Sequence, residues 1–350
     1  MAKKENMSNS IIQRVPWIDV CRGLGIILVL YGHLITHENH RYLIYAFHMP
    51  LFFFLSGLVF KPTFDKSLKS IFVKNFKQLL IPYFFFAIFT YLYALITSPK
   101  PDLTPGGITW QLFGILYGSG SDGMLGFNVV LWFLPCLFIT RLTFAFITRK
   151  VTQVKYIGII LLLCSIVGYI ISKLIPWIKL PFGVEIAFTG VVFFGLGYLW
   201  KIRKYTLHFL KPYRIPLIGI ALVIGYFAAT ANYHIGGHQV DLRADRYNNY
   251  FLFYIASFSG ILATILVSQL IRMNKILEYI GRNSMVIFVW HNLLIVNLQT
   301  VIKTLVSAEF IRSVQLFLPT FYALIVTIII LLMRKMLLII KTQQSFFTKK

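Results

Sequence analysis

The stretch RGLGIILVLYGH, residues 22–33, is an apolar run that begins with an arginine and ends with a histidine. Together with its neighbours, over residues 16–36, it is long enough to cross about 30 Å of hydrocarbon as a helix. Charged and titratable groups inside such a span are costly, so they normally face a cavity or a partner. This stretch therefore predicts a membrane helix with one chemically specialised face.

The composition of the whole chain agrees with this prediction. Of the 350 residues, 58% are hydrophobic and 13% are charged, whereas about a quarter of the residues of a soluble domain are charged. Apolar runs of membrane-spanning length lie at 16–36, 42–60, 79–97, 127–148, 155–175, 184–200, 213–231, 249–271, 284–301 and 315–340. The predicted fold class is all-α, a polytopic integral membrane protein of about ten transmembrane helices.

The basic residues predict how the chain is oriented in the membrane. The formal net charge is +23, but the lysines and arginines lie in short spacers between apolar runs, so no nucleic-acid partner is predicted. Most of them fall on one side if the N-terminus is cytoplasmic, which predicts that both termini are cytoplasmic. We expect a cytoplasmic segment 1–15, a membrane-embedded domain 16–340 and a basic cytoplasmic tail 341–350, in a bacterial plasma membrane.

Two loops and the cysteines complete this outline. Segment 61–78 is basic and amphipathic, and its Lys74 and Lys77 are predicted to contact either anionic lipid or an anionic cytosolic cofactor. Segment 98–126 is rich in turn residues and predicts an outer flap. The three cysteines lie in apolar runs without paired ligand spacing, so they predict packing and no metal site.

The first run places Arg22 and His33 on one face. They are eleven residues apart, which in an α-helix is three turns plus about 20°, and about 16 Å along the axis. Asp19 lies one turn before Arg22 and is placed to pair with it. Arg22 is either a lipid-surface anchor paired with Asp19 or a functional cation, and His33 is either a core histidine bonded across helices or a functional base.

Two further histidines are candidates for the same site. The connector between the first two runs is short, so they form antiparallel neighbours and His48 lies at a depth similar to that of His33. Pro50 frees a backbone carbonyl in the second run. His291 lies one heptad after Ser284, on the same predicted helix face.

Several motifs resemble one known family. These motifs are WIDVCRGLGIILVLYGH (17–33), IYAFHMPLFFFLSGLVF (44–60), VLWFLPCLF (130–138), FFGLGYLW (193–200) and YIGRNSMVIFVWH (279–291). In order, from about residue 15 to 335, they resemble the membrane-bound acyltransferase family 3, in particular its fucose 4-O-acetylase-like branch. Arginine, ten residues and histidine in the first helix is the most specific element.

The resemblance implies transfer of an acyl group, usually acetyl from cytosolic acetyl-CoA, to a hydroxyl of a carbohydrate at the membrane. It implies that His33 is the catalytic base and that Arg22 helps to hold the CoA side. The phosphates of CoA need cationic partners, so Lys74 and Lys77 are expected to help Arg22, and Asp19 belongs to the same predicted cofactor site as the partner of Arg22. A histidine titrates near working pH, and a guanidinium suits phosphates. Direct transfer and an acetyl-imidazole intermediate both remain open.

Other polar residues are candidates for binding substrate or the oxyanion. They are Ser56, Asn128, Trp132, Asn283, Ser284 and Glu185. Glu185 either binds sugar hydroxyls or lies in the headgroups. The expected partners are a glycan or lipid-linked sugar, membrane lipids and polysaccharide-synthesis machinery. A polysaccharide exporter or flippase, which also suits a titratable intramembrane histidine, and a non-catalytic membrane scaffold are the competing functions.

Overall fold

The computed structural model describes residues 15–35, 38–62, 67–97, 105–202, 211–314 and 317–347. Apart from one isolated bridge, Asp241 to Arg246, the regular structure of these residues is helical. The α-helices are α1 (Pro16–Leu34), α2 (Glu38–Tyr45), α3 (His48–Leu58), α4 (Leu68–Asn75), α5 (Ile81–Thr97), α6 (Pro105–Tyr117), α7 (Phe133–Lys150), α8 (Val154–Leu174), α9 (Val184–Ile202), α10 (Arg214–Gly236), α11 (Tyr250–Leu270), α12 (Lys275–Arg282), α13 (Ser284–Leu305), α14 (Ala308–Ser313) and α15 (Leu318–Phe347). A π-turn, η1 (Phe76–Leu80), and four 3-10 turns, η2 (Val129–Trp132), η3 (Pro181–Gly183), η4 (Lys211–Tyr213) and η5 (Leu242–Ala244), complete the set.

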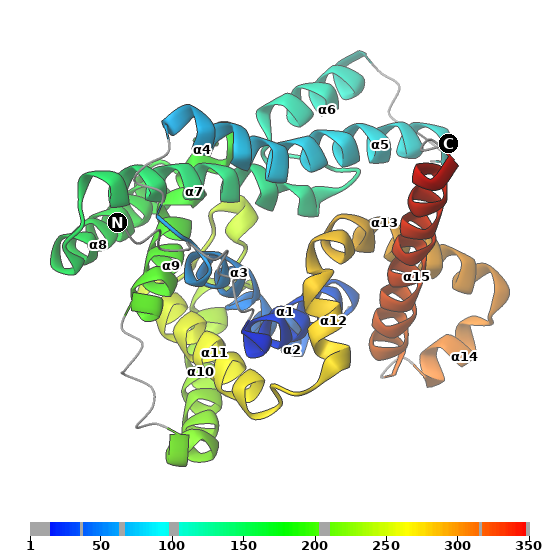
Figure 1. Cartoon of the computed structure of the whole chain (residues 1–350). Helices are drawn as coiled ribbons and strands as arrows, with labels where there is room; N and C mark the ends of the chain where they lie inside the picture. Colours follow the sequence, from blue (N-terminus) through cyan, green and yellow to red (C-terminus); the bar gives the residue numbers. More distant parts are fainter. Residues whose placement is uncertain are drawn as a thin grey trace, which may run out of the picture.

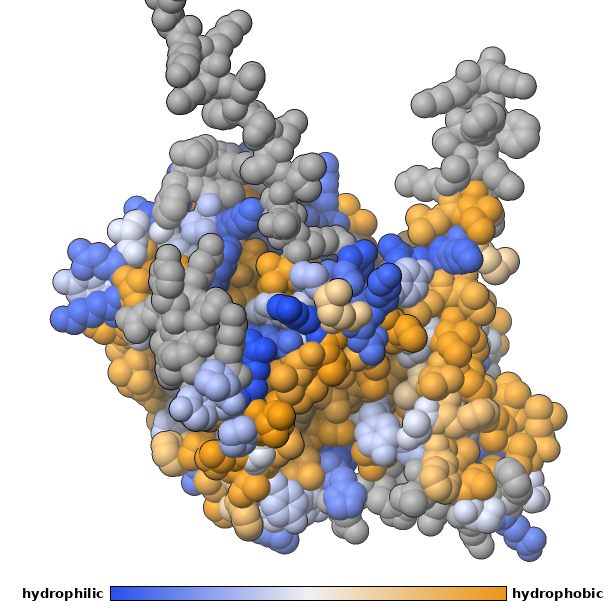
Figure 2. Space-filling model, turned by 60° about the horizontal axis from the view of Figure 1, so that its bottom comes forward, coloured by the Kyte–Doolittle hydropathy of each residue, from blue (hydrophilic) through white to orange (hydrophobic). Residues whose placement is uncertain are grey.

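The described part of the chain contains nine helical stretches that are long and apolar enough to cross a membrane. They are Pro16–Leu34, Leu68–Thr97, Val129–Lys150, Val154–Leu174, Pro181–Ile202, Arg214–Gly236, Tyr250–Leu270, Ser284–Leu305 and Leu318–Ile339. The all-α polytopic membrane fold is therefore confirmed. Figure 2 shows one face of the molecule, on which apolar side chains cover broad areas and hydrophilic ones gather near the centre.

The predicted second span, 42–60, is not one helix. It is divided into α2 and α3, and the helix breaks at Ala46 and Phe47. Pro50 is the physical reason, because a proline has no amide hydrogen for the carbonyl four residues earlier. That carbonyl belongs to Ala46, and the Ser257 hydroxyl of α11 donates to it at 2.6 Å. The break places the polar residues at the end of α2 and at the start of α3 next to the end of α1.

Helix α1 lies at the centre of the molecule (Figure 1). It packs against α3, α11, α12, α13 and α15, and 56% of its apolar window is buried, against 17% for α8. Its contact with α12 is unusually close, because a Cβ on Gly23 or on Gly281 would overlap backbone atoms of the other helix. This close crossing brings the end of α12 beside the first turn of α1.

Two predicted loops contain helices. The described part of segment 61–78 forms α4 and η1, which continue directly into α5, so that the span predicted at 79–97 begins at Leu68. The predicted flap 98–126 contains α6, and its turn residues flank the apolar sequence ITWQLFGILY rather than interrupting it. Both segments were predicted as connections between spans, but each contains helical residues.

The predicted terminal segments are described only in part. Residues 1–14 lie outside the described residues, and α15 continues to Phe347, so most of the predicted tail 341–350 is helical in its backbone. The cytoplasmic location of both ends stays a prediction.

Candidate active site

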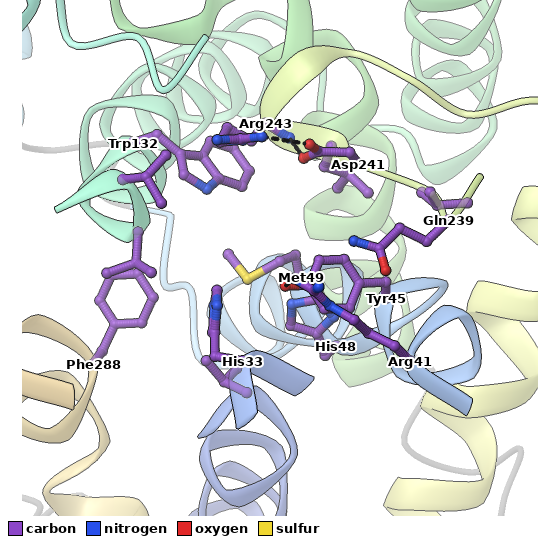
Figure 3. Close-up of a pocket in the computed structure, with 15 residues that line it drawn as sticks. His33, Arg41, Tyr45, His48, Met49, Trp132, Gln239, Asp241, Arg243 and Phe288 are labelled. Carbon is purple, nitrogen blue, oxygen red and sulfur yellow. Dashed lines mark hydrogen bonds and ion pairs between the residues drawn. The ribbon is translucent and has the colours of Figure 1, made fainter. Parts of the chain in front are cut away.

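A cavity of about 150 Å³ opens where α1 ends (Figure 3). Its walls come from α1, α2, α3, η2, α13 and the connection between α10 and α11. The lining residues are Val29, His33, Arg41, Tyr45, His48, Met49, Val129, Val130, Trp132, Gln239, Val240, Asp241, Leu242, Arg243 and Phe288. Segments that are far apart in the sequence thus meet around one histidine.

His33 lies in the last turn of α1, and its ring points into the cavity (Figure 3). The ring centroid lies 5.3 Å from that of His291 and 6.1 Å from that of Tyr45. No residue that the structure describes makes a hydrogen bond to the His33 imidazole. Both ring nitrogens are therefore available to a molecule in the cavity.

His48 and His291 are held in fixed orientations by their own helices. Nδ1 of His48 lies 2.9 Å from the carbonyl oxygen of Ile44, and Nδ1 of His291 lies 2.7 Å from that of Phe288. A carbonyl oxygen only accepts, so Nδ1 carries the hydrogen in each neutral ring and Nε2 is left as an acceptor. Nε2 of His291 is buried and has no hydrogen-bond partner among the described residues.

Three charged side chains line the cavity. The Arg41 guanidinium donates to the Tyr45 hydroxyl at 2.9 Å, and Arg243 donates to Asp241 at 2.8 Å. Two guanidiniums and one carboxylate thus line the cavity, which gives it a cationic excess. This excess favours a ligand or reaction step in which negative charge develops.

Sequence reasoning did not select the charged and polar residues of this rim. Arg41 and Tyr45 lie in the short helix α2, and Gln239, Asp241 and Arg243 lie in the connection between α10 and α11. The one available signal was the polar composition of segment 232–248, whose position over the end of α1 depends on the tertiary fold.

Arg22 lies at the opposite end of α1, outside this cavity. Its Nη1 donates to Asp19 Oδ1 at 3.1 Å, and Arg282 of α12 places Nε 3.6 Å from the other oxygen of the same carboxylate. Glu278 forms an ion pair with Arg282. Two guanidiniums therefore share the buried Asp19. Lys74 and Lys77 are exposed on α4 and η1, with no ion pair to a described residue.

The other predicted substrate residues are spread over several places. Trp132 lines the cavity, and Asn128 is buried next to η2, where its Nδ2 donates to the Val289 carbonyl at 3.4 Å. Ser56 lies about two turns from the cavity residue Met49 on α3, and Ser284 lies about one turn from the cavity residue Phe288 on α13; neither serine lines the cavity.

Two buried residues face other neighbours. Nδ2 of Asn283 donates to the Tyr279 carbonyl at 2.7 Å. Glu185 is fully buried at the start of α9, where it accepts from the Leu180 amide at 3.0 Å. Glu185 therefore lies neither in the headgroups nor on the wall of this cavity. No group of three His, Cys, Asp or Glu residues in the described part of the chain is arranged to hold a metal ion.

Comparison with known proteins gives information on the chain as a whole. A family model described as an acyltransferase domain matches residues 15–334, which is most of the chain. No curated protein and no solved structure gives a significant match.

Proposed function

Because the chain belongs to the acyltransferase 3 family, a family of membrane acyltransferases, we propose that it is an O-acetyltransferase acting on a carbohydrate. The donor is acetyl-CoA, and the acceptor is a hydroxyl of a glycan or lipid-linked sugar at the outer side of a bacterial plasma membrane. The position of His33 carries this proposal: its ring points into a cavity and makes no hydrogen bond to the described protein.

His33 acts as the base. It takes the proton of the sugar hydroxyl while the hydroxyl oxygen attacks the thioester carbonyl. The new carbon–oxygen bond forms, the carbon–sulfur bond breaks, and the CoA thiolate recovers the proton from the imidazolium. Nearby guanidiniums of Arg41 and Arg243 and the indole of Trp132 are the donors available to the negative charge that develops on the carbonyl oxygen. Transfer through an acetyl group on His33 uses the same residues.

His291 supports His33 rather than replacing it. Its Nδ1 is occupied by the Phe288 carbonyl, and its ring lies beside that of His33. A neutral neighbouring imidazole with a free Nε2 is an acceptor for a proton on His33 or on the substrate. His48, fixed in the same way by Ile44, is the second such neighbour.

The CoA end of the donor binds near Arg22. Arg22 and Arg282 form a pair of guanidiniums around Asp19, and guanidiniums bind phosphate oxygens well. Lys74 and Lys77 add exposed positive charge on α4 and η1. The distance of about 16 Å along α1 between Arg22 and His33 is then bridged by the extended arm that carries the acetyl thioester.

The test follows a radiolabelled acetyl group. Membranes containing the native chain are supplied with labelled acetyl-CoA, and the label is expected in the glycan or glycolipid fraction. In His33→Ala the label falls by a factor of about 10² to 10⁴, the contribution of a general base. The matched control, His234→Ala, removes an exposed histidine of α10 and leaves labelling unchanged.

Two outcomes would contradict the proposal. Undiminished labelling in His33→Ala, at equal membrane abundance, removes His33 from the chemistry. Export of unmodified glycan by the native chain, without any acetylation, favours the exporter.

A further inference from the structure

A second cavity, of about 510 Å³, lies next to the first. It is bounded by the end of α8 with the connection to η3 and by residues 238 and 244–248 of the connection between α10 and α11. Residues 239–243 of that connection line the His33 cavity. One short segment therefore forms a wall of both cavities, and a chain-like ligand that occupies the second cavity lies close to the first.

The segment that separates the cavities is held firmly. Its main chain is bridged between Asp241 and Arg246 at 2.9 and 3.0 Å. Ser121 donates to the Arg243 carbonyl at 3.0 Å, and Lys179 donates to the Ala244 carbonyl at 2.9 Å. The shape of this wall is thus fixed by contacts from two other connections.

Asp245 is the unusual residue of the second cavity. Its side chain is only 4% exposed, and neither carboxylate oxygen has a hydrogen-bond partner among the described residues. The hydroxyl of Tyr247, which also lines this cavity, is likewise buried without a partner. Such groups are costly to bury unless something binds them. A carboxylate and a phenol together accept and donate hydrogen bonds, as the hydroxyls of a sugar require.

Trp177 supplies an apolar platform at the same cavity. Its side chain is 73% exposed although it lines the cavity. An indole face packs well against the C–H face of a pyranose ring. A tryptophan at this level also suits a membrane-interface anchor, but an anchor does not explain the orphaned carboxylate beside it.

Charges of both signs line the second cavity. The Lys173 ammonium donates to the Asn248 carbonyl at 2.8 Å, and the Lys179 ammonium donates to the Ala244 carbonyl at 2.9 Å. Asp122 and Asp245 lie on the same wall as three cations, Lys173, Lys179 and Arg246. Donors and acceptors are therefore both present, as recognition of sugar hydroxyls requires.

We propose that the second cavity is a subsite for a pyranose residue of the acceptor glycan, a neighbour of the residue acylated at His33. Trp177 stacks on the ring, and Asp245 and Tyr247 bind its hydroxyls. This proposal rests on the carbohydrate acceptor proposed above. It predicts that the enzyme recognises at least two successive sugar residues.

The test measures binding without acyl transfer. The full-length chain in detergent is applied to an array of immobilised oligosaccharides, neutral and anionic. The native protein is expected to bind a subset of these glycans. Trp177→Ala and Asp245→Asn weaken that binding at least tenfold, and Trp177→Phe restores part of it. Ile178→Ala, which alters an adjacent exposed side chain outside the cavity, is the matched control and binds normally.

The outcomes separate this proposal from the proposed function. Native-level binding by Trp177→Ala and Asp245→Asn, or no binding to any glycan, overturns the subsite. Loss of binding in these variants supports it, even if the native chain transfers no acetyl group. In the transfer assay the same variants raise KM for an oligosaccharide acceptor and leave KM for acetyl-CoA unchanged.

Discussion

At the scale of single residues, the contrast between the two ends of α1 defines the chemistry. Arg22 is balanced by Asp19 and shares it with Arg282, whereas His33 has no protein partner in the described structure. The Arg22 guanidinium, which is paired with a carboxylate, suits reversible binding of an anion. The His33 imidazole, which has no hydrogen-bond partner in the described structure, suits proton transfer. The two residues are therefore expected to respond differently to substitution.

Arg22→Ala is expected to raise KM for acetyl-CoA by about tenfold or more and to change kcat much less. The physical reason is that the guanidinium contacts the donor equally in the ground state and in the transition state. Steady-state kinetics with varied acetyl-CoA checks this prediction, and Arg149→Ala, at the end of α7, serves as a control cation. An unaltered KM would remove Arg22 from the donor site.

Asp245 is predicted to make stability depend on pH. Burial raises the pKa of Asp245 from 3.8 to about 7, so the folded state favours the protonated carboxyl. Between pH 4 and pH 7 this residue is ionised in the unfolded chain and protonated in the folded chain. The free energy of unfolding is therefore not reduced by Asp245 below pH 3.8, and it falls as the pH rises from 3.8 to about 7. Asp245→Asn removes this loss of stability with rising pH, because an amide does not ionise.

Thermal unfolding of the purified protein tests this sign. Asp245→Asn is expected to stabilise the protein at pH 8 by a few kcal/mol, up to about 4 at 1.36 kcal/mol per pKa unit. The gain is smaller at pH 5, because Asp245 has reduced the free energy of unfolding by less at that pH. A gain of equal size at both pH values would show that Asp245 does not titrate as described.

At the scale of elements, the crossing of α1 and α12 positions the Arg22 end. Gly281→Ala is expected to destabilise the protein by about 1 to 3 kcal/mol, because the new methyl group overlaps the Asp19 carbonyl and must push the helices apart. Gly219→Ala is the control, since a Cβ there meets no atom within 4 Å. Thermal unfolding of both variants measures the difference, and equal midpoints would contradict the close crossing.

Periodicity within one helix was predictable from the sequence, and contacts between helices mostly were not. The spacing of Arg22 and His33 predicted that they lie at opposite ends of one helix. The short connector predicted that His48 lies near His33, and both line the same cavity. The approach of His291 depends on how α13 packs beside α1. The same limit applies to Arg41, which lies in the short helix α2, and to Asp241, whose connection between α10 and α11 carries no periodic signal. The break at Ala46 was predictable in part: Pro50 indicated that a backbone carbonyl is freed, but the sequence did not indicate that Ser257 binds it.

At the scale of the whole molecule, the broken α2 and α3 pair decides the sidedness of the chain. Nine uninterrupted spans in the described part would place the termini on opposite sides. We expect the pair to cross as a tenth, interrupted span, with both termini cytoplasmic. Reporter fusions at residues 1 and 350, with one reporter active only in the cytoplasm and one only outside, test this. Reporters on opposite sides would mean that the pair does not cross.

The central position of α1 has a consequence for biogenesis. It is synthesised well before α11, α12, α13 and α15, which pack against it in the finished protein and begin only at Tyr250 and beyond. While the intervening residues are being made, Arg22 is without Arg282 and α12 as neighbours. Lipid is a poor solvent for such a segment, so α1 is expected to stay beside the insertion machinery until these later spans arrive. Assembly of this protein therefore closes around a helix made well before most of its neighbours.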